Sequence, residues 1–308
     1  MGLLKRTRWP LFLIVLIFWV AGWGIAFLDA TAKIYATSRH EAMQVAAQSA
    51  AALFAQEMAE RSTEIDLLRR VSTFTHESLS SSEVRQLLEL RQSTHEEYLW
   101  IGVANPQGVV VQGTNGVLVG ESVAARPWFK VAQSRTYIGD VHEAALLAGR
   151  IPESTIHEPL RFVDFASPIV TPGGQLKGVL AGHASWNWVG RSVNAKVLRA
   201  LGRDGVEMLV INQKGECLYP VSALSLQMPV DLTSMKEAAP VLWPDGKVWV
   251  TAVGSVKLPS EANGFTWHVV IRQLASASKT DGEETMRRRF IAVLIVTAVI
   301  VAGALYLK

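Results

Sequence analysis

The chain has 308 residues, a formal net charge of +3 from 30 Lys and Arg against 27 Asp and Glu, and one cysteine. The basic residues are scattered without a stripe of interleaved aromatics, so we expect no nucleic-acid partner. Cys217 stands alone, which excludes an internal disulfide and a cysteine-based metal cluster.

Two uncharged apolar runs lie near the ends of the chain, at residues 9–28 and 290–307. Each is long enough for a helix to cross a hydrocarbon core of roughly 30 Å. We therefore predict two transmembrane helices and a short cytoplasmic N-terminus, residues 1–8, whose basic residues favour that orientation. Ala30-Thr31-Ala32 also resembles a cleavage site, so a cleaved signal peptide stays an alternative for the first run.

A long stalk helix is predicted over residues 29–78, because residues 31–75 lack Pro and Gly and are rich in helix formers. Along this helix, one set of residues recurs at alternating spacings of four and three positions, so its side chains form a stripe on one face. It comprises Ala47, Ala51, Phe54, Met58, Arg61, Ile65 and Leu68. Either the helix packs this stripe on its own domain, or the stripe forms a dimer seam that carries a signal to the first span. We expect a homodimer through this helix.

The sequence then changes to short β-rich runs with turn signals between them. Short helices are expected at 80–90 and 125–134, and strands at 98–104, 109–112, 162–170, 175–185, 247–256 and 265–272.

The frame Val-x-Asn-x-x-Gly occurs at residues 103–108 and returns at 210–215. A turn repeated within the same order of strands indicates two similar modules in tandem. We place a membrane-distal module at 79–190 and a membrane-proximal module at 191–289, linked by a helix at 187–201.

The segment Arg126-Pro127-Trp128-Phe129, followed by Tyr137-Ile138-Gly139-Asp140, resembles the double Cache (PAS-like) sensor domains of bacterial transmembrane receptors. The resemblance covers most of the region between the two spans. It implies an α+β fold, with two tandem PAS-like modules behind one long N-terminal helix and two flanking transmembrane helices. It also implies a periplasmic sensor on the bacterial inner membrane that binds a small molecule in its distal module.

Receptors of this family continue into an output domain. Gly139–Ala144 looks like the segments found in front of diguanylate cyclase domains, whereas this chain stops at Lys308. We expect either a receptor without its output domain or a standalone sensor that works through a partner.

The resemblance also implies a ligand site. In amino-acid-binding members an Arg-x-Trp-Tyr unit holds the ligand carboxylate; Arg126 and Trp128 match it, and Phe129 replaces the Tyr. Tyr137 and Asp140 approximate a loop Tyr and Asp, with one extra residue between them.

An Asp expected at the end of the Gly178–Gly182 strand is His183 here, which removes one counter-charge for a ligand ammonium. We therefore expect a small carboxylate-bearing ligand rather than a free α-amino acid. Asp164, Trp186 and Trp188 are expected near the same cavity. The predicted ligand site contains Arg126, Trp128, Phe129, Tyr137, Asp140, His142, Asp164 and His183.

Each site residue has a structural alternative: Arg126 could pair with a surface carboxylate, Asp140 could belong to a turn, and the aromatic residues and His183 could be core. The chain lacks Gly-x-Ser-x-Gly, a Walker loop and His-Glu-x-x-His, so we predict no catalytic residues, no cofactor and no metal. Two rival functions remain, a membrane-anchored enzyme and a structural protein that dimerises through its long helix without a ligand.

Overall fold

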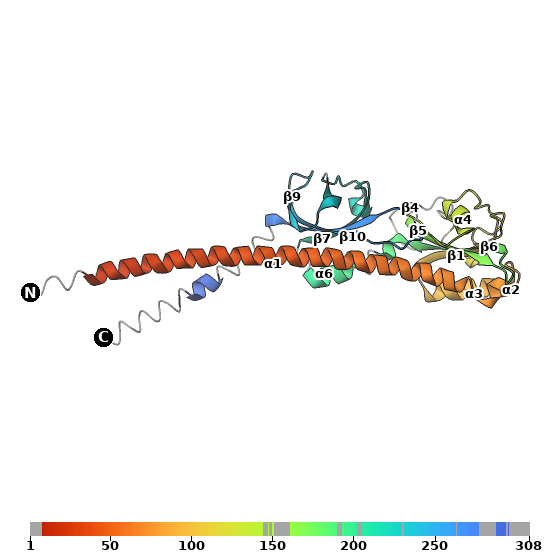
Figure 1. The fold of residues 1–308 in the computed structure, drawn as a ribbon, viewed down its shortest axis with the longest axis horizontal. Coiled ribbons are helices and arrows are strands. Elements are labelled where there is room, and N and C mark those ends of the chain that lie inside the picture. The colour runs from red at the N-terminus through yellow and green to blue at the C-terminus, as the bar shows by residue number, and fades with distance from the viewer. Residues whose placement is uncertain are drawn as a thin grey trace, which may run out of the picture.

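The structure is a computed structural model that describes residues 8–143, 147, 150, 161–189, 193–201, 205–229, 231–262, 264–276, 288–293 and 295. One helix, α1 (Arg8–Leu68), runs along the molecule, and two antiparallel sheets follow one another along it (Figure 1). We call the sheet near the C-terminal end of α1, with its helices, the distal module. The other sheet belongs to the proximal module.

The distal sheet has the strand order β2-β1-β6-β5-β3, and β4 pairs with β5. Its strands are β1 (Tyr98–Ala104), β2 (Val110–Gly113), β3 (Tyr137–Ile138), β4 (His142–Glu143), β5 (Arg161–Val170) and β6 (Leu176–Ser185). Its helices are α2 (Ser72–His76), α3 (Ser82–Thr94) and α4 (Pro127–Ala132). Ser81 caps α3 by accepting a hydrogen bond from the Val84 amide, at 3.3 Å.

The proximal sheet has the order β8-β7-β11-β10-β9, which repeats the distal order strand for strand. Its strands are β7 (Val206–Asn212), β8 (Cys217–Tyr219), β9 (Ala239–Leu242), β10 (Val248–Val256) and β11 (Trp267–Leu274). Two short helices, α5 (Trp186–Val189) and α6 (Ala195–Leu201), lie between the modules in sequence. The two antiparallel sheets behind one long helix confirm the α+β fold and are consistent with tandem PAS-like modules.

The repeated sequence frame forms the same turn twice. The Asn105 Oδ1 accepts from the amides of Gln107 and Val109, and the Asn212 Oδ1 accepts from the amides of Lys214 and Glu216. In each turn the glycine that closes the frame has a positive φ, near 80°, which is accessible to glycine at little cost. The internal repeat seen in the sequence is therefore a structural repeat.

The stripe on α1 packs on the two sheets of its own chain. Its six apolar members are 9 % exposed or less, and four of them, Ala47, Phe54, Met58 and Ile65, are fully buried. β10 approaches so closely that a Cβ on Gly254 would collide with the Ala47 carbonyl. This stripe is therefore not a dimer seam, because the sheets of the chain itself cover it.

The predicted first span, residues 9–28, forms the beginning of α1, and the second, residues 290–307, lies mostly outside the described residues. Among the helices of the described segments, none combines the length and the apolar character needed to cross a membrane. A Cβ on Gly24 would lie 3.1 Å from the Phe290 ring, and the Arg289 guanidinium lies 5.8 Å from the centre of the Tyr35 ring. The two ends of the chain thus lie side by side where they are described.

Candidate functional site

A cavity of about 360 Å³ opens on the face of the distal sheet opposite α1. Seven of the eight predicted site residues line it; the eighth, Phe129, does not. The complete lining is Leu118, Val123, Arg126, Pro127, Trp128, Tyr137, Asp140, Val141, His142, Leu147, Phe162, Asp164 and His183. The structure therefore brings together residues that span 58 positions of the sequence, from Arg126 to His183.

The start of α4 separates the roles of two adjacent aromatic residues. Pro127 occupies the first turn, where its missing N–H costs nothing, and Arg126 is the cap residue before it. Trp128 and Phe129 point in different directions because successive helical residues differ by about 100°. The Trp128 side chain lines the cavity. Phe129 is a buried core residue, and its ring packs edge-on against the Trp128 ring, with the ring centroids 5.9 Å apart.

Arg126 is the cation at the cavity mouth. Its side chain is half-buried, and among the described residues no carboxylate forms an ion pair with it. A guanidinium can bind a carboxylate with two parallel hydrogen bonds, which makes this residue suited to an anionic ligand group.

Asp164 and His183 form a buried pair on the cavity floor. They are directly opposite in the register of β5 and β6, and His183 Nδ1 is hydrogen-bonded to Asp164 Oδ1. The second carboxylate oxygen of Asp164 lies 3.6 Å from His142 Nε2. Asp164 is thus oriented by an imidazole on each side.

Three aromatic rings surround the imidazole of His183. Trp100 stacks on it with centroids 4.9 Å apart, and Trp128 and Phe162 each lie at 5.8 Å. Aromatic rings at these separations pack favourably, and the hydrogen bond to the adjacent Asp164 carboxylate adds a directional contact. This environment fixes His183 in place as a wall of the cavity.

Tyr137 supplies a hydroxyl to the cavity. Burial, reinforced by the negative charges of Asp164 and Asp140, raises the pKa of Tyr137 to about 12. The phenol therefore stays protonated at neutral pH and can donate a hydrogen bond to a bound group.

Asp140 connects the cavity to the proximal module. Its Oδ1 accepts a hydrogen bond from the indole Nε1 of Trp267, at 2.8 Å, and another from the Val141 amide, also at 2.8 Å. No local sequence pattern predicts this partner, because 127 residues separate Asp140 from Trp267.

Two tryptophans expected near the cavity lie elsewhere. Trp186 is fully buried at the junction between the modules, 5.1 Å from Trp267 and 6.3 Å from Phe54. Trp188 lies beside the Arg61 guanidinium, at 5.7 Å. The strand of His183 ends at Ser185, so the chain has already left the cavity where these residues begin.

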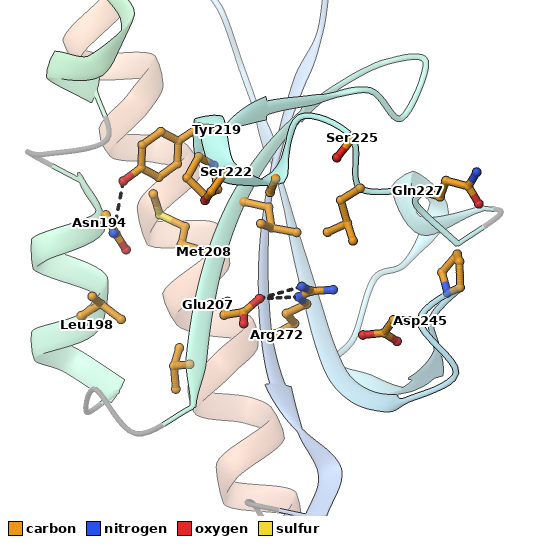
Figure 2. A pocket seen from close by; sticks show the side chains of 16 residues that line it. Asn194, Leu198, Glu207, Met208, Tyr219, Ser222, Ser225, Gln227, Asp245 and Arg272 are labelled. Atoms are coloured by element: carbon orange, nitrogen blue, oxygen red, sulfur yellow. Dashed lines mark hydrogen bonds and ion pairs between the residues drawn. The ribbon is translucent and has the colours of Figure 1, made fainter. Parts of the chain in front are cut away.

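A larger cavity, of about 710 Å³, lies in the proximal module, and Figure 2 shows its side chains. Its cation, Arg272, points toward Glu207 and donates from Nε and Nη2 to the same carboxylate oxygen, at 2.9 and 2.7 Å. The guanidinium also lies 4.2 and 4.1 Å from the ring centres of Trp243 and Trp249. Arg272 is already neutralised and stacked, so the distal cavity is the better ligand site despite its smaller volume.

Comparison with known proteins identifies relatives by structure. No family model matches the sequence, and no curated protein matches it. The ligand-binding domain of the Pseudomonas fluorescens chemoreceptor CtaA, in complex with L-leucine, is 15 % identical with a TM-score of 0.53, over 78 % of this chain and 97 % of that chain.

Two domains from Pseudomonas aeruginosa PAO1 are also similar. The ligand-binding domain of the amino-acid chemoreceptor PctC, in complex with GABA, is 18 % identical with a TM-score of 0.54. The match covers 74 % of this chain and 96 % of that chain. The ligand-binding domain of the chemoreceptor PctB, in complex with L-Arg, is 21 % identical with a TM-score of 0.51. The match covers 78 % of this chain and 96 % of that chain. The chain has the double Cache fold of bacterial chemoreceptor ligand-binding domains, as its sequence motifs predicted.

Proposed function

We propose that this chain is the input domain of a membrane-anchored sensor, and that it binds a small carboxylate-bearing molecule in the distal cavity. The observation that supports this most is the convergence of Arg126, Tyr137 and Asp140 on one cavity of about 360 Å³. That volume falls in the range of small-molecule sites.

The cavity divides into a polar and an apolar part. Arg126 would hold the ligand carboxylate, and the Tyr137 hydroxyl can donate to it or to a neighbouring oxygen. Leu118, Val123 and Phe162 supply apolar surface for the remainder of the ligand. The Asp164 carboxylate is hydrogen-bonded to His183, so in this proposal the pair shapes the cavity and needs no charged ligand group.

We propose further that the sensor lies in the periplasm and is anchored in the bacterial inner membrane by two transmembrane helices, residues 9–28 and 290–307. The contact of Phe290 with Gly24 supports a second span that runs beside the first. Ligand binding would shift one span relative to the other, by a coupling of typically 1–3 kcal/mol, toward a diguanylate cyclase or another output domain.

A homodimer through the outer face of α1 belongs to the same proposal. Ile34, Val45 and Leu67 are 64 %, 61 % and 61 % exposed and lie 11 and 22 residues apart. Eleven residues make three helical turns almost exactly, so these apolar side chains share one face. A second copy could cover that face without disturbing the stripe that packs on the sheets.

The function is tested by titrating the full chain in lipid nanodiscs with L-alanine, L-leucine, GABA, propionate, 4-methylpentanoate and butyrate. We expect saturable heat and a raised melting temperature with at least one acid. Amides of the same acids should not bind, because they lack the charge that Arg126 would hold. An unchanged melting temperature with every acid would reject the carboxylate sensor and favour the structural rival, and turnover of a bound acid would favour the enzyme.

A further inference from the structure

We propose that the proximal module holds a second binding site, in which a short free peptide without a negative charge binds as an added strand beside β7. The site is the cavity of about 710 Å³ shown in Figure 2. It shares no lining residue with the distal cavity, so this proposal does not depend on the carboxylate-bearing ligand proposed there.

Part of β7 lacks a neighbouring strand on one side. β11 pairs with all seven residues of β7, whereas β8, among the described residues, pairs only with Val210 and Ile211. β8 ends at Tyr219, and the following Pro220 has no N–H with which to continue the ladder. The β8 side of Val206–Leu209 is therefore an open strand edge.

The backbone groups of this edge are available for hydrogen bonds. The Asn212 amide donates to the Glu216 carbonyl, at 3.0 Å, so the backbone groups of Asn212 face the β8 side. Successive residues of a strand direct these groups to alternate sides, and the register of β7 with β11 is regular. The N–H and C=O groups of Met208 and Val206 therefore face the open edge, where the described strands leave them unpaired. Such groups are a template for an added strand.

The cavity follows this edge and does not lie on one face of the sheet. Its lining includes four consecutive residues, Val206, Glu207, Met208 and Leu209. Alternate side chains of a strand point to opposite faces. Met208 belongs to the core cluster that contains the buried residues of α1, whereas Leu209 belongs to the cluster on the other face. A cavity that touches both sets of side chains must lie along the edge between them.

Two buried polar atoms of lining residues have no hydrogen-bond partner among the residues that the structure describes. They are Asn194 Oδ1, directly before α6, and Arg272 Nη1, on β11. Arg272 is 6 % exposed, and its Nε and Nη2 already donate to Glu207. Buried polar atoms are normally hydrogen-bonded, because an unmade bond costs free energy. A peptide group carries an N–H that suits the first atom and a C=O that suits the second.

The charges of the cavity disfavour an anionic peptide. Its lining has two carboxylates, Glu207 and Asp245, against one guanidinium, Arg272, which is paired with Glu207. Leu198 and Leu226 supply apolar surface for the side chains of a peptide. Recognition by an added strand combines such side-chain contacts with main-chain hydrogen bonds.

The dimensions of the site favour a short peptide. The open edge comprises four residues and is about 13 Å long, at roughly 3.3 Å per residue. The cavity volume of about 710 Å³ lies within the range of small-molecule sites. A free peptide of about three or four residues matches both the edge and the volume.

The test uses three probes, which are titrated into the full chain in lipid nanodiscs. The first is acetyl-Ala-Ala-Ala amide, which is uncharged. The second is its ester analogue, in which an oxygen atom replaces each inner N–H. The third is acetyl-Ala-Ala-Ala with a free C-terminal carboxylate. Calorimetry measures the affinities, and amide hydrogen exchange of residues 206–209 reports on the edge of β7.

We expect the uncharged peptide to bind saturably and to slow the exchange of residues 206–209. The ester analogue should bind on the order of 10-fold more weakly, because it cannot donate to the strand carbonyls. The carboxylate form should also bind more weakly, because it meets two carboxylates. The proposal is overturned if the uncharged peptide does not bind, if the ester analogue binds as tightly, or if the exchange of residues 206–209 is unchanged.

A variant that fills the cavity locates the peptide. Ser222 is exposed, lies in the 3₁₀ helix Val221–Ala223 and lines the cavity, so Ser222→Trp should weaken peptide binding by at least about 10-fold. Ser234→Trp is the matched control, because Ser234 is an exposed serine of the 3₁₀ helix Leu232–Ser234 in the same module and does not line the cavity. The control should bind like the wild type.

Two further results would overturn the proposal. If Ser222→Trp binds the peptide as the wild type does, the peptide lies elsewhere on the protein. If the exchange of residues 206–209 slows with rising protein concentration and without peptide, a second copy of the chain occupies the edge. If Ser222→Trp melts at a lower temperature than Ser234→Trp, the comparison of the amide and ester probes on the wild type decides, because it needs no variant.

Discussion

Asp164 and His183 lie opposite one another on β5 and β6, and the Asp164 carboxylate accepts a hydrogen bond from the imidazole. Both residues are nearly buried, at 4 % and 6 % exposure. The sequence led us to expect a ligand-binding Asp at position 183. That position holds a histidine instead, and the carboxylate beside it is Asp164 of the neighbouring strand. The pair builds the cavity floor, and the ligand contacts that we propose are therefore Arg126, Tyr137 and Asp140, which line the same cavity.

Removing one member of this pair should destabilise the fold. Asp164→Ala leaves the buried His183 without its acceptor, and we expect a loss of about 3 kcal/mol in the free energy of unfolding. Asp164→Asn keeps an acceptor oxygen and should lose only about 1 kcal/mol. Urea unfolding of both variants checks this, and equal stability of the two variants would show that the hydrogen bond contributes little.

The Arg126 side chain should be needed for binding and dispensable for folding. Arg126→Ala should weaken binding of any acid that the wild type binds by about 100-fold, since it removes a charge-assisted bidentate contact. Arg126→Lys keeps the positive charge but not the bidentate geometry of the guanidinium, so its affinity should lie between those of the wild type and Arg126→Ala. Calorimetric titration measures the affinities, and a melting temperature within error of the wild type shows that the fold is intact. Unchanged affinity in Arg126→Ala would remove the residue from the site.

The packing of α1 on the proximal sheet should not tolerate a side chain at Gly254. Gly254→Ala would place its Cβ against the Ala47 carbonyl and the Gln48 amide, so the strand or the helix must shift. We expect a loss of about 1–3 kcal/mol, measured by thermal unfolding. Gly173→Ala is the control, because its Cβ would lie 3.7 Å from the Thr171 hydroxyl, an ordinary contact. A similar loss in both variants would point to a general glycine effect.

His268 should make stability fall in acid. Burial lowers the pKa of His268 below its usual value of 6.5. Between these two pKa values the unfolded chain binds a proton that the folded chain does not, so the free energy of unfolding decreases as the pH falls below about 6.5. Urea unfolding from pH 7.5 to 5 should show a smaller decrease in His268→Gln than in the wild type. An identical decrease would exclude His268 as a cause.

A charge on the outer face of α1 should separate the proposed dimer. Val45 is 61 % exposed, so Val45→Glu leaves the packing on the sheets undisturbed, but it would bury a charge in an interface between two copies. We expect a dimer in the wild type and a monomer in the variant, by light scattering in detergent. Leu90→Glu is the matched control, because Leu90 is 62 % exposed but lies on α3 rather than on the outer face of α1. A wild-type monomer would reject the proposal.

The sequence predicted the elements well where local rules decide them. The strands at 98–104 and 247–256 match β1 and β10 within a residue, and the turns at Asn105 and Asn212 are as similar as their frames suggested. β3, β4, β8 and β9 were missed, because they have only two to four residues each. β7 was recognised only through the turn frame at its end, residues 210–215. The stripe on α1 showed that one face would be buried, but periodicity does not say whether the same chain or a second copy covers it.

The sequence by itself determined the repeat, the fold class and seven side chains of the cavity, because turn residues, alternation and a resemblance to known sensors act over short stretches. Only the tertiary structure decided how the polar groups of the cavity are paired: Asp164 pairs with His183 across two strands, and Trp267 reaches Asp140 from the other module. These contacts join residues 19 and 127 positions apart, and such pairings follow from strand register and module packing, which no local pattern records.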